Sequence, residues 1–65
     1  SNAVSIGNYI VVGDAMGYLH VYDRTSGALV DRKQAKSDVA VLQFINNRLI
    51  AQSANGAFSV WQVNR

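Results

Sequence analysis

The stretch Asn8-Tyr-Ile-Val-Val-Gly-Asp-Ala-Met-Gly-Tyr-Leu-His-Val-Tyr-Asp23 decides the fold, because the chain repeats its pattern 39 residues later. The second copy is Asn47-Arg-Leu-Ile-Ala-Gln-Ser-Ala-Asn-Gly-Ala-Phe-Ser-Val-Trp-Gln62. Four pairs of positions are identical and four more stay apolar: Asn8/Asn47, Ala15/Ala54, Gly17/Gly56, Val21/Val60, then Ile10/Leu49, Val11/Ile50, Leu19/Phe58 and Tyr22/Trp61. A period of about 40 residues is typical of repeat architectures, in which each unit is one supersecondary element.

Each copy predicts a β-hairpin. Residues 9–13 are a compact apolar run that favours a buried strand, and residues 18–23 form the returning strand. The turn at 14–17 opens with aspartate and closes with glycine, which adopts the positive φ that a tight hairpin turn requires. The second copy repeats this order with strands at 48–52 and 57–63.

The remaining segments also predict strands. Residues 28–34 begin apolar and become charged, as expected of an outer strand that faces solvent, whereas residues 39–45 are strongly apolar. Residues 4–6 read as the remnant of an inner strand. No segment has the periodicity of an amphipathic helix, and the chain contains no proline to interrupt the strands. We therefore predict an all-β fold.

The strand order and the period predict the antiparallel four-stranded blades of a β-propeller, with roughly one and a half blades present. Residues 1–3 resemble the scar of a cleaved expression tag, so we expect a fragment of a longer chain. Residues 4–34 are a partial first blade, with three strands and the remnant of its inner strand. Residues 35–38 are a connection, and residues 39–65 are a second blade that lacks its outer strand.

The chain resembles the β-propellers built from PQQ-type repeats, whose blades carry an Asp-x-x-Thr-Gly motif before the outer strand. Asp23, Ser26 and Gly27 match this motif, with serine in place of threonine. Asp31 stands where these repeats usually carry a tryptophan, so the tryptophan docking of the quinone enzymes is not supported there. Within this group, residues 11–20 and 47–56 are similar to the C-terminal end of a family of Gram-negative lipoproteins that assist the assembly of outer-membrane proteins.

This resemblance implies a non-catalytic scaffold at the periplasmic face of the outer membrane, with no cofactor. Its partners would be other protein subunits of the outer-membrane barrel assembly complex. It would contact the membrane only through a lipid anchor that lies outside this fragment. Two alternatives stay open, namely the propeller of a PQQ-dependent dehydrogenase and a blade pair of another propeller scaffold.

The composition argues against several classes of function. The 65 residues suffice for one small domain, and the absence of cysteine rules out a disulfide or a thiolate metal site. The net charge is +2, but only Arg32 and Lys33 are adjacent among the basic residues, so we expect no nucleic-acid surface. No run of about 18 apolar residues predicts a transmembrane helix.

The polar residues do not combine into a pattern for chemistry. His20 is the only histidine, and the sequence supplies no second member of a catalytic triad for it. Asp14 and Asp23 are typical turn residues, and the turn at 14–17 lacks the several oxygen ligands that calcium needs. We therefore expect no catalytic, cofactor-binding or metal-binding residue.

The last strand predicts an interface between chains. Its apolar residues are accompanied by no charge, and an uncharged apolar edge is a template for pairing with another strand. The residues assigned to this edge are Phe58, Val60, Trp61 and Val63. We expect self-association through open blade edges, and exposed apolar blade faces at Tyr9, Val11, Val39, Val41, Leu49 and Trp61.

Overall fold

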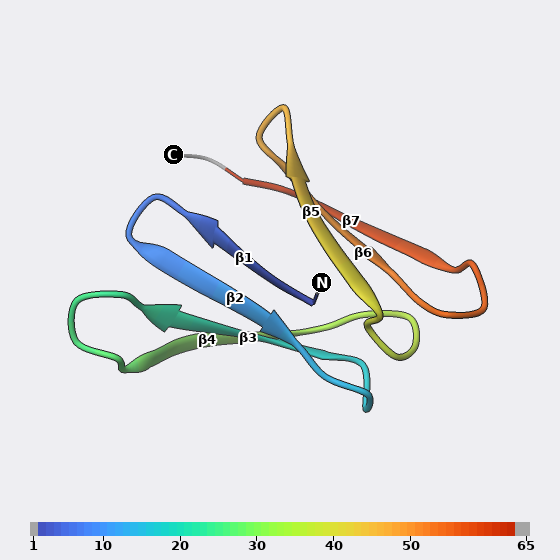
Figure 1. Ribbon diagram of the computed structural model, residues 1–65, viewed down its shortest axis with the longest axis horizontal. Coiled ribbons are helices and arrows are strands. Elements are labelled where there is room, and N and C mark those ends of the chain that lie inside the picture. The colour runs from blue at the N-terminus through green and yellow to red at the C-terminus, as the bar shows by residue number, and fades with distance from the viewer. Residues whose placement is uncertain (1, 64–65) are drawn as a thin grey trace.

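The computed structural model describes residues 2–63, and these residues form seven strands and no helix (Figure 1). The strands are β1 (Ala3–Ile6), β2 (Tyr9–Gly13), β3 (Tyr18–Asp23), β4 (Leu29–Gln34), β5 (Val41–Ile45), β6 (Arg48–Gln52) and β7 (Phe58–Gln62). They make one sheet in the order β1-β2-β3-β4 and a second in the order β5-β6-β7, with antiparallel pairing throughout. The predicted all-β fold class is confirmed. No helix within residues 2–63 is long and apolar enough to cross a membrane.

The first strand is more complete than the sequence predicts. β1 begins at Ala3 and pairs with β2 along its length, whereas we expected only a remnant at residues 4–6. Asn2 extends this contact, because its side-chain Nδ2 donates a hydrogen bond to the Gly13 carbonyl at 3.0 Å. Ser1, from the predicted scar, lies outside the described residues, as do residues 64–65 of the predicted second blade.

Tight turns close the hairpins as predicted. Gly17 and Gly56 have φ values of +93° and +91°, and each donates its N–H to the carbonyl of the first turn residue, at 3.3 and 3.2 Å. Asn46 and Asn47, between β5 and β6, both have positive φ. Two consecutive left-handed residues are the signature of a type I′ hairpin turn, and asparagine tolerates them well.

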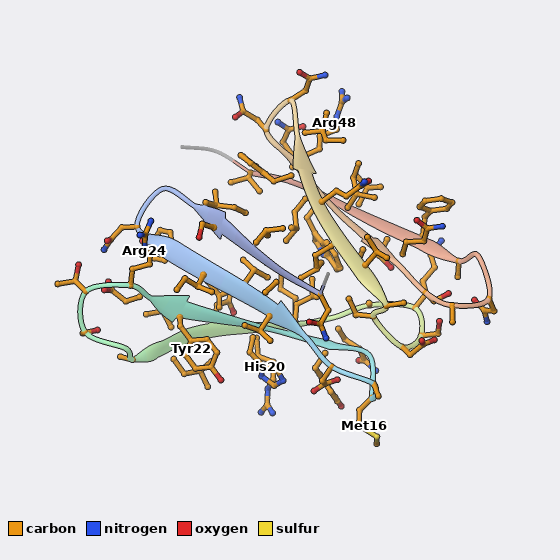
Figure 2. All side chains as sticks on the ribbon, viewed as in Figure 1. Met16, His20, Tyr22, Arg24 and Arg48 are labelled. Carbon is orange, nitrogen blue, oxygen red and sulfur yellow. The ribbon has the colours of Figure 1, made fainter. Side chains whose placement is uncertain are left out.

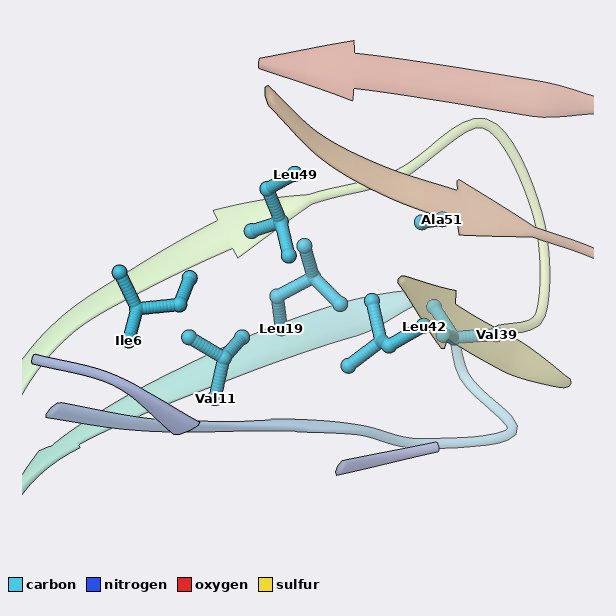
Figure 3. Packing of buried hydrophobic residues seen from close by; sticks show 7 residues of the cluster. All are labelled: Ile6, Val11, Leu19, Val39, Leu42, Leu49 and Ala51. Atoms are coloured by element: carbon cyan, nitrogen blue, oxygen red, sulfur yellow. The ribbon is translucent and has the colours of Figure 1, made fainter. Parts of the chain in front are cut away.

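The two sheets pack face to face, and the hydrophobic core lies between them (Figure 3). Strands of both sheets contribute to it, and Leu19 at its centre is 0% exposed. The buried side chains are Ile6, Val11, Leu19, Val39, Leu42, Leu49 and Ala51. Half-buried Val21, Phe44 and Trp61 pack around them.

The expectation of exposed blade faces was wrong at three positions. Val11, Val39 and Leu49 are only 3–4% exposed. The physical reason is that the two sheets cover one face of each other, so part of each apolar face is buried within this chain. The other expected positions are half-buried or exposed, namely Val41, Trp61 and Tyr9.

The connection between the sheets is held by backbone hydrogen bonds. The Ala35 N–H donates to the Gly17 carbonyl at 2.7 Å, and the Val39 N–H donates to the Asp14 carbonyl at 3.0 Å. These bonds tie both ends of the connection to the turn of the first hairpin. That turn therefore sets where the chain enters the second sheet.

Candidate functional site

The predicted inter-chain site lies on β7, the edge strand of the second sheet. The structure places its four residues on two faces. Phe58 and Val60 point away from the first sheet and are 52% and 57% exposed, whereas Trp61 and Val63 are half-buried and pack against the core. Side chains alternate between the faces of a strand, so this division could have been derived from the sequence.

The backbone of β7 offers hydrogen-bonding groups to a further strand. The Val63 N–H donates to the Asn47 carbonyl at 2.8 Å, so this pair is of the hydrogen-bonded type. Such pairs alternate along an antiparallel ladder. Phe58, Val60 and Gln62 therefore direct their N–H and C=O groups away from β6. Within residues 2–63, no strand pairs with this edge.

A groove of about 560 Å³ runs between β7 and the end of β4. Its lining consists of Gln34, Ala35 and Lys36 on one side and Phe58, Ser59, Val60 and Trp61 on the other. The Lys36 N–H donates to Ser59 Oγ at 3.1 Å and joins the two sides. A bound strand needs main-chain partners together with space for its side chains. The edge of β7 and this groove supply both.

The edge of the first sheet is different in character. β4 carries Asp31, Arg32 and Lys33, and Lys33 Nζ lies 3.5 Å from Asp31 Oδ2 on the exposed strand. Charged residues on an edge strand discourage pairing with another chain, because an apposed strand would have to desolvate them. Of these two outer strands, β7 is therefore the more receptive.

A polar cluster lies at the first hairpin turn, where His20 projects away from the second sheet (Figure 2). Asp14 Oδ1 accepts hydrogen bonds from the N–H groups of Met16 and Tyr18, at 2.9 and 3.0 Å, and Asp14 Oδ2 lies 2.8 Å from His20 Nε2. The hydrogen bond to His20, followed by that from the Tyr18 N–H, lowers the pKa of Asp14. The Arg32 guanidinium lies 5.5 Å from the Tyr18 ring centre.

The sequence treats Asp14 and His20 separately, and the structure brings them together. The signal was available, since a residue early in the returning strand can reach back to its own turn. An aspartate–histidine pair needs a nucleophile for acyl transfer. Among the described residues, Asp14 is the side chain that contacts His20 Nε2, and no serine or threonine hydroxyl does. The pair therefore stabilises the turn.

Asp23 has a similar structural role in the next turn. Its Oδ1 accepts hydrogen bonds from the N–H groups of Thr25 and Ser26, at 2.8 and 3.0 Å. These two hydrogen bonds, with that of Ser26 the larger influence, lower the pKa of Asp23. Within residues 2–63, no group of three histidine, aspartate or glutamate side chains could hold a metal ion.

Known proteins with similar sequences and structures share one name. The outer membrane protein assembly factor BamB of Marinobacter adhaerens is 36% identical over 59 residues, which cover 86% of this chain and 15% of that protein. The BamB of Shewanella oneidensis is 36% identical over 55 residues, or 82% of this chain and 14% of that protein. The crystal structure of BamB from Moraxella catarrhalis matches 95% of this chain and 18% of that one, with 47% identity and a TM-score of 0.84. No family model matches the chain.

The matched region is a small part of each relative. The chain spans about 15% of the length of the curated relatives it matches. The crystal structure is matched by both sheets, since the match covers 95% of the chain. The two packed antiparallel sheets are therefore a segment of a BamB-like propeller.

Proposed function

The chain belongs to the BamB family of outer membrane protein assembly factors, and we propose that it acts as a non-catalytic scaffold that binds other proteins. The observation that carries this proposal is the open, uncharged edge of β7 in a chain similar to assembly factors. The outward backbone groups of Phe58, Val60 and Gln62 would receive an extended segment of the partner as a further strand. Strand addition of this kind needs no chemistry at the site.

We assign the partners to the protein subunits of the outer-membrane barrel assembly complex, at the periplasmic face of the outer membrane. The name of the relatives supports this assignment, because they are outer membrane protein assembly factors. The groove beside β7 supports the mode of binding, since it leaves room for side chains of an added strand. The same edge could also pair with the edge of a second copy, which would be self-association.

The enzyme alternative is not favoured. A quinone-dependent dehydrogenase would need ligands for its cofactor, and the relatives carry the name of an assembly factor. Asp31 stands on an exposed strand and is paired with Lys33, at the position where the quinone enzymes use a docking tryptophan. We expect no change in absorbance when PQQ is added to the chain.

A binding experiment with a blocked edge tests the proposal. The 65-residue chain is synthesised with a biotin label, in the natural form and with an N-methyl group on the Val60 backbone nitrogen. Binding to the purified, detergent-solubilised barrel assembly complex is measured on a sensor surface. N-methylation removes an outward donor and keeps the side chain, so we expect binding to weaken about tenfold, since each lost hydrogen bond is worth about 1 kcal/mol and the methyl group adds steric hindrance.

The matched control is an N-methyl group on Asn55, an exposed turn residue away from the strand edge. This control is expected to bind as the natural chain does. No binding by the natural chain would contradict the scaffold function. Equal binding by the Val60 and Asn55 derivatives would contradict the edge of β7 as the site.

A further inference from the structure

The interface between the two sheets shows how one repeat unit packs on the next. We call the face that each sheet turns toward the other its inner face and the opposite face its outer face. The inner face of the first sheet carries Ile6, Val11 and Leu19, and that of the second carries Leu42, Leu49 and Ala51. Because the units repeat after 39 residues, every position in one sheet has a counterpart in the other.

The outer face of the second sheet matches the inner face of the first. Ile6, Val11, Leu19 and Val21 have the counterparts Ile45, Ile50, Phe58 and Val60. All four counterparts are apolar, and the strand register places Ile50 directly opposite Val60. Ile45 is 50% exposed, although its counterpart Ile6 is buried. Apolar surface that is covered in the first unit is thus uncovered in the second.

The outer face of the first sheet matches the inner face of the second in the same way. Leu42, Leu49, Ala51 and Trp61 have the counterparts Ala3, Ile10, Val12 and Tyr22. Ile10 lies directly opposite Tyr22 across β2 and β3. Figure 2 shows Tyr22 projecting away from the second sheet. This face therefore repeats the apolar pattern of a face that already binds a neighbouring sheet.

We propose that a second copy of this chain covers these two faces. The outer face of the second sheet in one copy packs on the outer face of the first sheet in the next copy, as the inner faces pack within the chain. The two surfaces differ, so the contact is heterologous, or head-to-tail. Repeating one rotation between sheets around a central channel is how propellers close, so the assembly is a closed ring.

The sizes of the side chains fit this arrangement. Leu19 lies among Leu42 and Leu49 in the core (Figure 3). In the contact between copies, Phe58 takes the place of Leu19, and Ala3 takes the place of Leu42. A larger side chain thus meets a smaller one, which preserves the volume that close packing requires.

This interface is separate from the strand edge in the proposed function and does not depend on it. Ile45 is on β5, at the side of the sheet opposite β7, and Ile50 is on the central strand β6. Their side chains contact a facing sheet without using any backbone group of the β7 edge. The two contacts can therefore be blocked independently.

The test uses one charge on each face. Ile45→Glu places a carboxylate on the outer face of the second sheet, and Ile10→Glu places one on the outer face of the first. Light scattering after size exclusion is expected to give one discrete mass for the natural chain, at a whole multiple of the chain mass. Each variant alone is expected to be a monomer. Met16→Glu, at an exposed turn residue, is the control and is expected to assemble normally.

Mixing the two variants in equal amounts identifies a head-to-tail contact. One variant keeps an intact first outer face and the other an intact second outer face, so the mixture is expected to form a dimer. Both variants carry an added negative charge, so charge attraction between them cannot produce it. Recovery of the dimer also shows that both variants fold. A monomeric natural chain, or a mixture that stays monomeric, would overturn the proposal.

The chain N-methylated at Val60 separates this interface from edge pairing. Its side chains are unchanged, so it is expected to assemble with the mass of the natural chain. A monomeric N-methylated chain would overturn face-to-face packing and assign self-association to the β7 edge. Assembly that persists while binding to the barrel assembly complex is lost would support both proposals separately.

Discussion

Gly13 and Val39 lie so close together that a Cβ atom added at residue 13 would be 2.6 Å from Val39 Cβ. Gly13 is not among the glycines with positive φ, so the close approach, and not the backbone conformation, requires glycine there. Val39 is buried, and its N–H is bonded to the Asp14 carbonyl, so it cannot easily move aside. This contact joins the end of β2 to the chain that enters the second sheet.

Gly13→Ala is expected to lower the free energy of unfolding by about 1–3 kcal/mol, because the added methyl group overpacks the core. Urea denaturation followed by circular dichroism measures the change. The control is the double variant Gly13→Ala with Val39→Ala, in which the smaller residue makes room. Its loss should be smaller than the sum of the two single losses. Additive losses would show that the two residues do not compete for space.

Asn47→Ala is expected to destabilise the β5–β6 turn by about 1–2 kcal/mol, since alanine at positive φ brings its Cβ too close to the backbone. Asn47 has φ of 61°. Asn47→Gly is the matched control and should cost nothing measurable, because glycine adopts this region freely. Thermal unfolding compares the three chains. Equal effects of alanine and glycine would mean that the asparagine side chain, and not the backbone angle, matters.

Acid is expected to weaken the first hairpin turn through Asp14. Its hydrogen bonds to His20 and the Tyr18 N–H lower its pKa below 3.8. A lowered folded-state pKa contributes stability above pH 3.8, and this stability is lost as the pH falls through the folded-state value. Urea midpoints measured between pH 6 and pH 2 should therefore fall steeply below about pH 4.

Asp14→Asn is the variant that isolates this effect. Asparagine keeps an oxygen acceptor for the turn but cannot ionise. The variant should be less stable than the natural chain at pH 6, and the difference should shrink as the pH falls below 3.8. A difference that stays constant across this range would mean that ionisation of Asp14 does not contribute to stability.

Trp61 and Val60 are adjacent in β7 but are expected to respond differently to substitution. Both changes are made in the Ile45→Glu chain, so that assembly does not contribute. Trp61→Ala removes a side chain packed against the core and should cost at least about 2 kcal/mol. Val60→Thr changes an exposed residue and should stay within about 0.5 kcal/mol. Circular dichroism during urea unfolding measures both, and similar losses would contradict the assignment of their faces.

Much of the fold follows from local patterns in the sequence. The turn at Asp14–Gly17 and the Asn46–Asn47 turn were predicted from residues that supply positive φ or accept hydrogen bonds from their own backbone. The strands follow from apolar and β-branched runs between these turns. The BamB family was also predicted from residues 11–20 and 47–56, and the relatives confirm it.

The site was predicted less completely. The sequence identified the last strand as an uncharged edge, and the structure shows that only Phe58 and Val60 of the four residues are on the exposed face. The contact between Asp14 and His20 was not foreseen, because it depends on how the hairpin turn directs two side chains. Such contacts depend on three-dimensional direction, which spacing alone does not give.

The repeat that begins at Asn8 and Asn47 shows where sequence and tertiary structure divide. By itself, the sequence determined two similar hairpins, because turn chemistry and strand propensity act over a few residues. It could not determine that Leu19 is fully buried while its counterpart Phe58 is half exposed. Both are large apolar residues at the same position of the same unit. Only tertiary structure decides between them, because burial depends on whether another sheet covers the face.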